Sequence, residues 1–247
     1  MVDYLDTAHG ARLAYHQQDG AGPGIVFLGG FRSDMNGTKA LYLEDWARAQ
    51  GRAFLRFDYT GHGESSGTFT DGSIGDWARD AQAMLHARTQ GPQILVGSSM
   101  GGWIALLLAR AMRDRVHALV GIAAAPDFTE DSMWPHLTEA QRAEVLELGQ
   151  TALPSDYDDG PYIVTRKLFE DGRDQLVLRS PLPLPFPVRL LQGTADEAVE
   201  TQVPLRLMAH ADCPDMRLTL VKDADHRFSS PDCLALITDT IAALTPR

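Results

Sequence analysis

The segment GPQILVGSSMGGWIALLLAR, residues 91–110, carries the clearest structural pattern in the chain. A short apolar run over 93–97 leads into two serines, a methionine and two glycines, and a nearly all-apolar segment follows over 100–112. The first run predicts a buried strand and the last segment a buried helix. Between them, residues 97–101 fit the G-x-S-x-G pattern of a sharp strand-to-helix turn. The pattern therefore predicts a turn that holds a serine exposed above a sheet.

Within this pattern, Ser99 has a glycine two positions before it and another two positions after it. Ser98 has Val96 and Met100 at the corresponding positions. Such a turn needs small flanking residues, and it leaves a backbone N–H beside the serine at a helix N-terminus. The alternative is an ordinary glycine- and serine-rich turn, which the flanking strand and helix make less favourable. We therefore take Ser99 as the candidate nucleophile.

Length, charge and cysteine content limit the classes of protein that fit. The 247 residues suit one large domain, and the net charge of −11 disfavours nucleic acid or an anionic membrane surface as a partner. No apolar run reaches the roughly 18 residues of a membrane span, and the first ten residues do not resemble a secretion signal. Cys213 and Cys233 lack metal-ligand spacing and are expected to be idle thiols in a reducing compartment. These features predict a cytoplasmic location.

Strand-like and helix-like segments alternate along the chain. Strands are expected at 11–18, as an edge strand, and at 25–30, 53–59, 93–97, 117–125, 188–193 and 216–221. Helices are expected at 36–51, 73–88, 100–112, around 200–210, and at 231–244. Continuous apolar strands that alternate with helices imply an α/β fold with a mostly parallel sheet covered on both faces.

Residues 127–186 interrupt this alternation. A helix is expected in LTEAQRAEVLELG (137–149), where Thr138 and Gln141 have the spacing of a capping box, and a loop-rich aromatic stretch follows. No strand of the main sheet is expected there. We interpret the chain as a single domain, residues 1–247, with 127–186 as a cap inserted over the C-terminal ends of the strands, where open α/β folds bind ligands.

The cap segment has more apolar residues than a lid that meets only water would need. These residues are Trp134, Leu137, Tyr157, Tyr162, Leu168 and Phe169. About half of them are expected to form the small core of the cap itself, and the rest to line the mouth above the candidate nucleophile. Trp134 and Tyr162 are the candidate substrate contacts.

A serine hydroxyl needs a base to take its proton and a carboxylate to orient that base, in the chain order Ser, acid, His for this type of turn. Of the eight histidines, His226 alone follows the last expected strand, whereas His62 precedes the turn. A solvated loop histidine is the alternative interpretation of His226. Asp196 is the first carboxylate after the strand at 188–193, and it is the favoured acid. Three rival carboxylates remain open: Glu197, Asp223 and Asp225.

An acyl-transfer site also needs two donors for the oxyanion that forms during the reaction. The N–H of Met100, directly after the candidate nucleophile, is the first. The second is expected from the loop after the strand at 25–30, where Phe31 follows two glycines. An ordinary strand-ending turn is the alternative interpretation of these glycines.

Taken together, these residues resemble the serine hydrolases of the α/β-hydrolase superfamily over essentially the whole chain. RFDYTGHGESSG (56–67) is similar to a strand-and-loop motif of its esterase and lipase members. Four further segments resemble the mitochondrial palmitoyl-protein thioesterase family, which also hydrolyses the acyl glucuronide of mycophenolic acid: MNGTKA (35–40), GPQILVGSSMGGW (91–103), SPLPLPFPVRLLQG (180–193) and DADHR (223–227). The chain departs from that family in lacking a mitochondrial targeting segment.

The resemblance implies an α/β-hydrolase fold without a metal or organic cofactor. The catalytic triad of that family falls on Ser99, Asp196 and His226, and its oxyanion-hole donors fall on Phe31 and Met100. The implied reaction is hydrolysis of a small-molecule ester or thioester, or of an acylated protein, without stable membrane insertion. Four alternatives use the same fold: a carbon–carbon bond hydrolase, an aminopeptidase, a cofactor-free perhydrolase and a non-catalytic ligand receptor.

Overall fold

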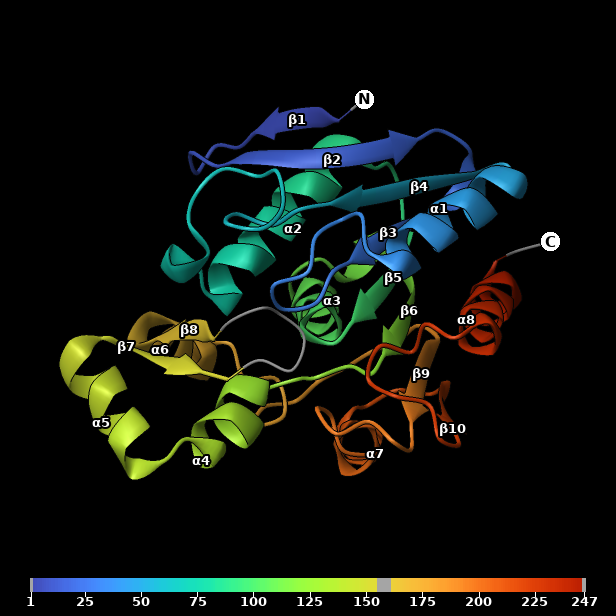
Figure 1. Ribbon diagram of the computed structural model, residues 1–247. Coiled ribbons are helices and arrows are strands. Elements are labelled where there is room, and N and C mark those ends of the chain that lie inside the picture. The colour runs from blue at the N-terminus through green and yellow to red at the C-terminus, as the bar shows by residue number, and fades with distance from the viewer. Residues whose placement is uncertain (1, 155–160, 246–247) are drawn as a thin grey trace.

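The computed structural model describes residues 2–154 and 161–245 and contains an eight-stranded sheet with helices on both faces (Figure 1). Its strands, in spatial order, are β1 (Asp3–Asp6), β2 (Arg12–Gln18), β4 (Arg52–Phe57), β3 (Ala21–Leu28), β5 (Gln93–Ser98), β6 (Val116–Ile122), β9 (Val188–Gly193) and β10 (Met216–Val221). From β4 to β10 all neighbours pair in parallel, whereas β2 is antiparallel to both β1 and β4. The predicted mostly parallel sheet is confirmed.

The prediction that residues 11–18 form an edge strand is wrong, because β1 pairs along the outer side of β2. The register sets Tyr4 opposite Ala14 and Leu5 opposite Leu13. Strand β1 has four residues, which are mostly exposed, and it begins and ends with an aspartate, Asp3 and Asp6. It therefore lacks the alternation of apolar and polar residues from which a strand is predicted.

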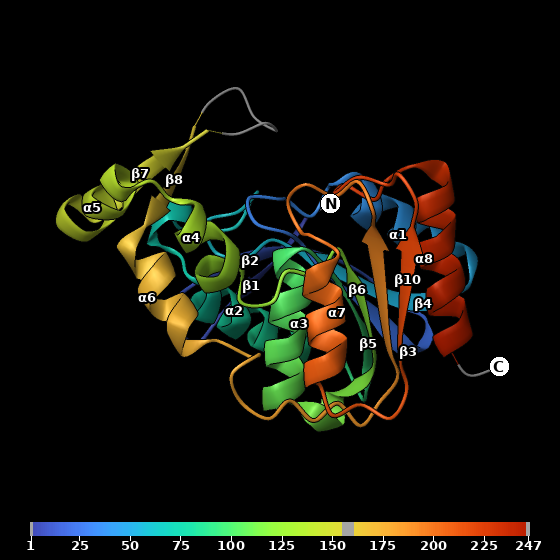
Figure 2. The same ribbon diagram turned by 90° about the horizontal axis from the view of Figure 1, so that it is seen from below.

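Two sets of helices cover the sheet (Figure 2). Helices α1 (Thr38–Ala49) and α8 (Pro231–Leu244) pack on one face, and α2 (Ile74–Arg88), α3 (Met100–Ala111) and α7 (Gln202–His210) pack on the other. Each face has its own cluster of buried apolar side chains. Helix α3 is buried over almost its whole length, which explains why its sequence is apolar on every side. Short helical turns connect these elements at Phe69–Asp71 and Arg113–Arg115.

The segment proposed as a cap has a separate set of elements beside the sheet (Figure 1). They are a π-helical turn (Thr129–Met133), α4 (Trp134–His136), α5 (Glu139–Leu148), β7 (Gln150–Leu153), β8 (Tyr162–Thr165) and α6 (Arg166–Asp174). Strands β7 and β8 form a two-stranded antiparallel sheet of their own. The expected capping box is present, since Thr138 Oγ1 accepts from the Gln141 N–H and Gln141 Oε1 accepts from the Thr138 N–H.

A buried aspartate near the start of this segment, Asp127, binds residues near its end. The Asp127 carboxylate accepts hydrogen bonds from the N–H groups of Val177 at 2.8 Å and Leu178 at 3.0 Å, and it pairs with Arg179. The chain thus returns to the sheet close to where it left. This closure supports the interpretation of 127–186 as a cap within a single domain, which stays a proposal.

Candidate active site

Ser99 lies at the turn between β5 and α3, with φ 54° and ψ −119°. A positive φ is uncommon and strained for a residue with a side chain. A Cβ added to Gly97 would lie 2.3 Å from the carbonyl O of Gly101, and a Cβ added to Gly101 would lie 2.0 Å from the carbonyl O of Leu28. Neither position has room for a side chain, so the turn itself requires the two glycines around Ser99.

His226 follows β10, and its imidazole lies against the carboxylate of Asp196, which follows β9. The Nδ1 atom of His226 is 3.0 Å from Oδ1 and 2.9 Å from Oδ2 of Asp196. Since an ionised carboxylate can only accept, Nδ1 carries a proton, and in the neutral ring the lone pair is therefore on Nε2. The ring is therefore in the tautomer that a general base requires.

Further donors fix the Asp196 carboxylate. Oδ1 accepts from the N–H groups of Ala198 at 3.0 Å and Val199 at 2.8 Å, and Oδ2 accepts from Gln192 Nε2 at 2.9 Å. Burial alone would raise the pKa of Asp196, but the hydrogen bond and charge of His226, with the Val199 and Gln192 bonds, hold that pKa below its usual range. The carboxylate therefore stays ionised beside the imidazole.

The three rival carboxylates lie differently. Asp225 Oδ1 accepts from the Phe228 N–H at 3.1 Å, within its own loop. Glu197 lines the cavity in front of the site, and Asp223 is exposed. Within residues 2–154 and 161–245, Asp196 is the one of the four with a hydrogen bond to His226.

The loop after β3 passes close to Ser99. A Cβ added to Gly30 would lie 3.4 Å from the Cβ of Ser99. Phe31 follows Gly30, and Met100 is the first residue of α3, where the N–H groups have no partner within the helix. Ser99 is therefore flanked by two backbone segments, as an oxyanion hole requires. That the N–H groups of Phe31 and Met100 serve as its donors stays a prediction.

His62 supports this loop, a role that the sequence analysis did not identify. Its Nε2 accepts a hydrogen bond from the Arg32 N–H at 3.3 Å, and its Nδ1 lies 3.3 Å from the carbonyl O of Thr60. Burial lowers the pKa of His62 to about 4, so the ring is neutral and can accept at one nitrogen and donate at the other. Three aromatic rings pack edge-to-face against it: Tyr59, Phe69 and Trp77.

Asp58, in the same RFDYTGHGESSG segment, connects two loops near the site. Its Oδ1 accepts from the Met35 N–H at 2.6 Å and its Oδ2 from the Glu64 N–H at 2.9 Å. A Cβ added to Gly63 would lie 2.1 Å from Asp58 Oδ2. In the sequence, the similarity of this segment to a known motif pointed to its importance, but it did not predict the contacts of Asp58.

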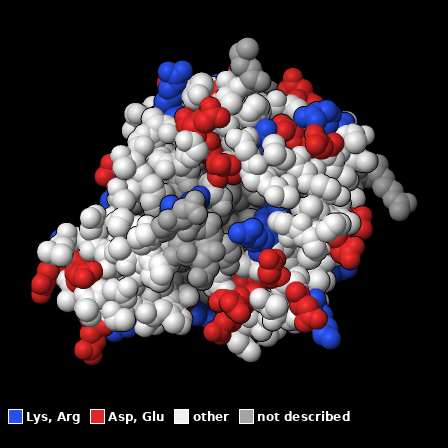
Figure 3. All heavy atoms as spheres, viewed as in Figure 1, with Lys and Arg blue, Asp and Glu red and all other residues white. Residues whose placement is uncertain are grey.

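Ser99 and His226 both line one cavity of about 800 Å³ at the C-terminal ends of the strands. Its cap side is largely apolar, with Phe128, Met133, Leu137, Leu153, Pro154 and Tyr162. Its other side is more polar and includes Arg32, Ser33, Lys39, Glu197 and Arg227. The face seen in Figure 3 has a hollow near its middle with Lys or Arg atoms on the border, in keeping with this lining.

The cap residues considered in the sequence analysis separate into two groups. Tyr162 and Leu137 line the cavity, and the ring of Tyr162 lies 6.1 Å from that of Phe31. Trp134 instead packs edge-to-face on Phe169 at 5.0 Å, within the cap, and is not among the residues of the cavity wall. Trp134 packs there because the cap helices need apolar side chains to fill the small core between them. Leu168 is buried as Phe169 is, and Tyr157 lies outside the described residues.

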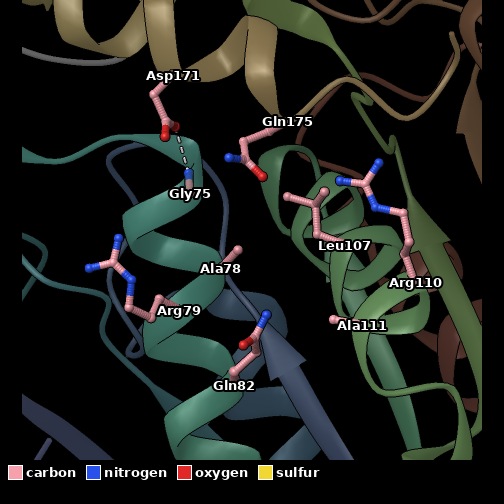
Figure 4. A pocket seen from close by; sticks show the side chains of 9 residues that line it. All are labelled: Gly75, Ala78, Arg79, Gln82, Leu107, Arg110, Ala111, Asp171 and Gln175. Atoms are coloured by element: carbon pink, nitrogen blue, oxygen red, sulfur yellow. Dashed lines mark hydrogen bonds between the residues drawn. The ribbon is translucent and has the colours of Figure 1, made fainter. Parts of the chain in front are cut away.

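A second hollow, of about 340 Å³, lies between α2, α3 and α6 (Figure 4). There the Asp171 carboxylate accepts a hydrogen bond from the Gly75 N–H at 2.7 Å, and Arg79, Gln82 and Arg110 line the walls. Its lining contains no serine, cysteine or histidine, and its carboxylate, Asp171, accepts the Gly75 N–H. In the described parts of the chain, no group of three or more His, Cys, Asp and Glu side chains is arranged to hold a metal ion.

Known proteins resemble this chain over most of its length. The family described as "Alpha/beta hydrolase family" matches residues 25–234. Palmitoyl-protein thioesterase ABHD10, mitochondrial, from Rattus norvegicus is 39% identical to this chain, and the match covers 97% of this chain and 81% of that protein. The Homo sapiens protein of the same name is 35% identical, and the match covers 97% of this chain and 78% of that protein. The structure of alpha/beta hydrolase domain-containing protein 10 from mouse has a TM-score of 0.91 at 36% identity and covers 99% of this chain and 98% of that one.

A crystal structure of an Agrobacterium vitis S4 protein assigned as a hydrolase has a TM-score of 0.95 at 40% identity, and it covers 100% of this chain and 99% of that one. These matches contradict the predicted cytoplasmic location, because the palmitoyl-protein thioesterases that match 97% of the chain are named as mitochondrial proteins. The prediction relied on the first ten residues and on two idle cysteines, and neither feature identifies a compartment. Among the described residues, no helix has both the length and the apolar character that crossing a membrane requires.

Proposed function

Because the chain belongs to the alpha/beta hydrolase family, whose model matches residues 25–234, we propose that it is a serine hydrolase that cleaves carboxylic esters or acyl thioesters. The resemblance to the palmitoyl-protein thioesterases is confirmed by identities of 39% and 35% over 97% of the chain. These relatives support an acyl substrate and hydrolysis of an ester or thioester bond. The assignment of the reaction to Ser99, His226 and Asp196 is our inference from the geometry.

In the proposed reaction, Ser99 Oγ attacks the carbonyl carbon of the substrate while Nε2 of His226 takes the hydroxyl proton. Asp196 holds the ring in the required tautomer and stabilises the imidazolium. The N–H groups of Phe31 and Met100 stabilise the oxyanion of the tetrahedral intermediate. When the intermediate collapses, His226 returns the proton to the leaving alcohol or thiol, and the acyl group remains on Ser99.

Water completes the cycle on the acyl-enzyme. His226 takes a proton from the water as it attacks the acyl carbonyl, and the second tetrahedral intermediate releases the carboxylic acid as Ser99 regains its proton. The protein residues supply every proton transfer. The observation that carries the proposal is that the strained Ser99 and the Asp196-bound His226 line the same cavity.

The difference between the two sides of the cavity supports a proposal for where the two parts of the substrate bind. An acyl chain would lie against the apolar cap side, where each methylene removed from water contributes about 0.8 kcal/mol. The leaving alcohol or thiol would lie on the polar side, near Ser33 and Glu197. We therefore propose medium or long acyl chains, carried by a small molecule or by an acylated protein.

A substrate panel tests this function against its alternatives. It contains an aryl ester, an acyl thioester, an aminoacyl arylamide and a β-diketone with a labile carbon–carbon bond. We expect hydrolysis of the ester and the thioester. Turnover of the arylamide or the diketone alone would favour an aminopeptidase or a carbon–carbon bond hydrolase, and an absence of turnover on all four would favour a receptor on the same fold.

A further inference from the structure

Lys39, in the first turn of α1, contacts the loop that carries His226. Its Nζ donates a hydrogen bond to the carbonyl O of Arg227, 188 residues later in the chain. Arg227 directly follows His226, so the bond restrains the loop one peptide unit beyond the one that follows the candidate base. Lys39, His226 and Arg227 all line the active-site cavity. The MNGTKA segment, to which the proposed reaction assigns no role, therefore reaches the site through its lysine.

The two sides of the His226 loop are held differently. Before His226, the Ala195 N–H donates to the Ala224 carbonyl at 3.0 Å and the Asp223 N–H donates to Thr194 Oγ1 at 2.9 Å, so the segment after β9 holds this side. After His226, the Phe228 N–H bonds back to Asp225 within the loop.

Helix α1 holds the second side in two ways. Phe228 is fully buried in the same apolar cluster as Ala40 and Leu43 of α1. The Lys39 bond adds a direction to this packing, because it orients the Arg227 carbonyl and with it the peptide plane between Arg227 and Phe228, one plane beyond the plane that follows His226. Within the loop, the Phe228 N–H bonds to Asp225 and Ser229 Oγ donates to the Arg227 carbonyl at 2.9 Å, and the Lys39 bond connects this peptide unit to α1.

The charge state of Lys39 suits this role. Burial lowers its pKa to about 8, with Arg227 acting in the same direction and Asp225 opposing it. The ammonium group is therefore still charged at pH 7, and its bond to the carbonyl is charge-assisted, which makes it stronger than a bond between neutral groups.

We propose that Lys39 is a positioning residue for His226, and that it acts on kcat by holding the Arg227 carbonyl rather than by binding substrate. This inference rests on the proposed function, since it requires His226 to be the base. A displacement of about 1 Å in a catalytic group can lower the rate by about 100-fold. We expect Lys39→Met to lower kcat by roughly 10- to 100-fold while KM changes by less than about twofold.

The test compares Lys39→Met and Lys39→Arg with a matched control, Lys167→Met. Lys167 Nζ also donates to a backbone carbonyl, that of Asp71 at 2.6 Å, and it pairs with Asp76 at 2.7 Å, but it does not line the cavity. We measure kcat and KM on an aryl ester and the thermal midpoint of each variant. The expected result is a kcat loss confined to Lys39→Met and largely restored in Lys39→Arg. Lys39→Gln, whose amide is too short to reach the carbonyl, replaces Lys39→Met if that variant does not fold.

Four results would overturn the proposal: an unchanged kcat in Lys39→Met, an equal loss in Lys167→Met, a loss confined to KM, or a loss that Lys39→Arg does not reduce. Ser99→Ala separates this inference from the function on which it rests. If Ser99→Ala is inactive while Lys39→Met is fully active, the positioning role alone is refuted. If Ser99→Ala keeps full activity, both are refuted.

Discussion

Nδ1 of His226 lies 2.9 Å from Oδ2 of Asp196, although the two residues are 30 positions apart. Their loops follow β9 and β10, which are parallel neighbours in register from Val188 and Met216 onward. The sheet thus brings the pair together. Gln192, near the end of β9, donates a hydrogen bond from Nε2 to Oδ2 of the same carboxylate. Each of these contacts can be removed singly.

Asp196→Asn should leave the fold intact and lower kcat by about 10⁴-fold, because an amide favours the wrong imidazole tautomer. Steady-state kinetics on an aryl ester, with the circular dichroism spectrum as a check on folding, measure this effect. Asp225→Asn is the matched control, since Asp225 bonds within its own loop. A far larger loss in Asp225→Asn than in Asp196→Asn would assign the acid to Asp225.

The lowered pKa of Asp196 predicts a pH-dependent contribution to stability. The unfolded chain binds a proton at the ordinary Asp pKa of about 3.9, and the folded chain binds it at a lower pH. The contribution is therefore present above about pH 3.9 and disappears as the pH falls through the folded-state pKa. Denaturant unfolding of the unmodified protein and Asp196→Asn between about pH 7 and 3 should show the difference in unfolding free energy shrinking on the acid side. A difference that grows there would contradict the assigned direction.

Met100→Leu should retain most of the activity, because the proposed oxyanion contact is made by the backbone N–H and the substitution conserves volume. Phe31→Leu should likewise keep kcat, although its effect on KM can be larger because Phe31 lines the cavity. Loss of an oxyanion donor costs about 2.7–4 kcal/mol of transition-state stabilisation. A kcat loss of that size in either variant, at an unchanged KM, would show that the side chain takes part in the reaction.

The apolar cap side of the cavity predicts a preference for longer acyl chains. We expect kcat/KM on aryl esters to rise from acetyl to octanoyl by up to about fourfold per methylene, which corresponds to about 0.8 kcal/mol each, and fatty-acyl thioesters to be cleaved. Met133→Ala, on the cavity wall, should weaken the preference, whereas Leu146→Ala, exposed on α5, should not. A profile that peaks at acetyl, with thioesters untouched, would instead indicate a short-chain carboxylesterase.

The sequence predicted those parts of the site that depend on local backbone geometry. The glycines around Ser99 are visible in the pattern because the turn excludes a Cβ at both positions. The pairing of His226 with Asp196 could be proposed because consecutive parallel strands end at the same edge of a sheet. Asp225 was a weaker candidate as the chain neighbour of His226, and its carboxylate bonds within its own loop.

Other features depend on contacts between distant segments and had no local signal. The bond from Lys39 to Arg227 spans 188 residues, and the contact of His62 with the Arg32 N–H joins two separate loops. Trp134 was a reasonable substrate contact on composition, yet an apolar residue in a small cap can equally fill its interior, as the contact with Phe169 shows.

Labelling with a fluorophosphonate shows whether Ser99 is the nucleophile. The reagent phosphonylates an activated serine, so the labelled peptide identifies the residue by mass spectrometry. Ser98→Ala is the matched control, because it removes the neighbouring hydroxyl while leaving the glycines of the turn in place. We predict that Ser99→Ala abolishes both labelling and ester hydrolysis while Ser98→Ala keeps both. Labelling that persists in Ser99→Ala and disappears in Ser98→Ala would instead assign the nucleophile to Ser98.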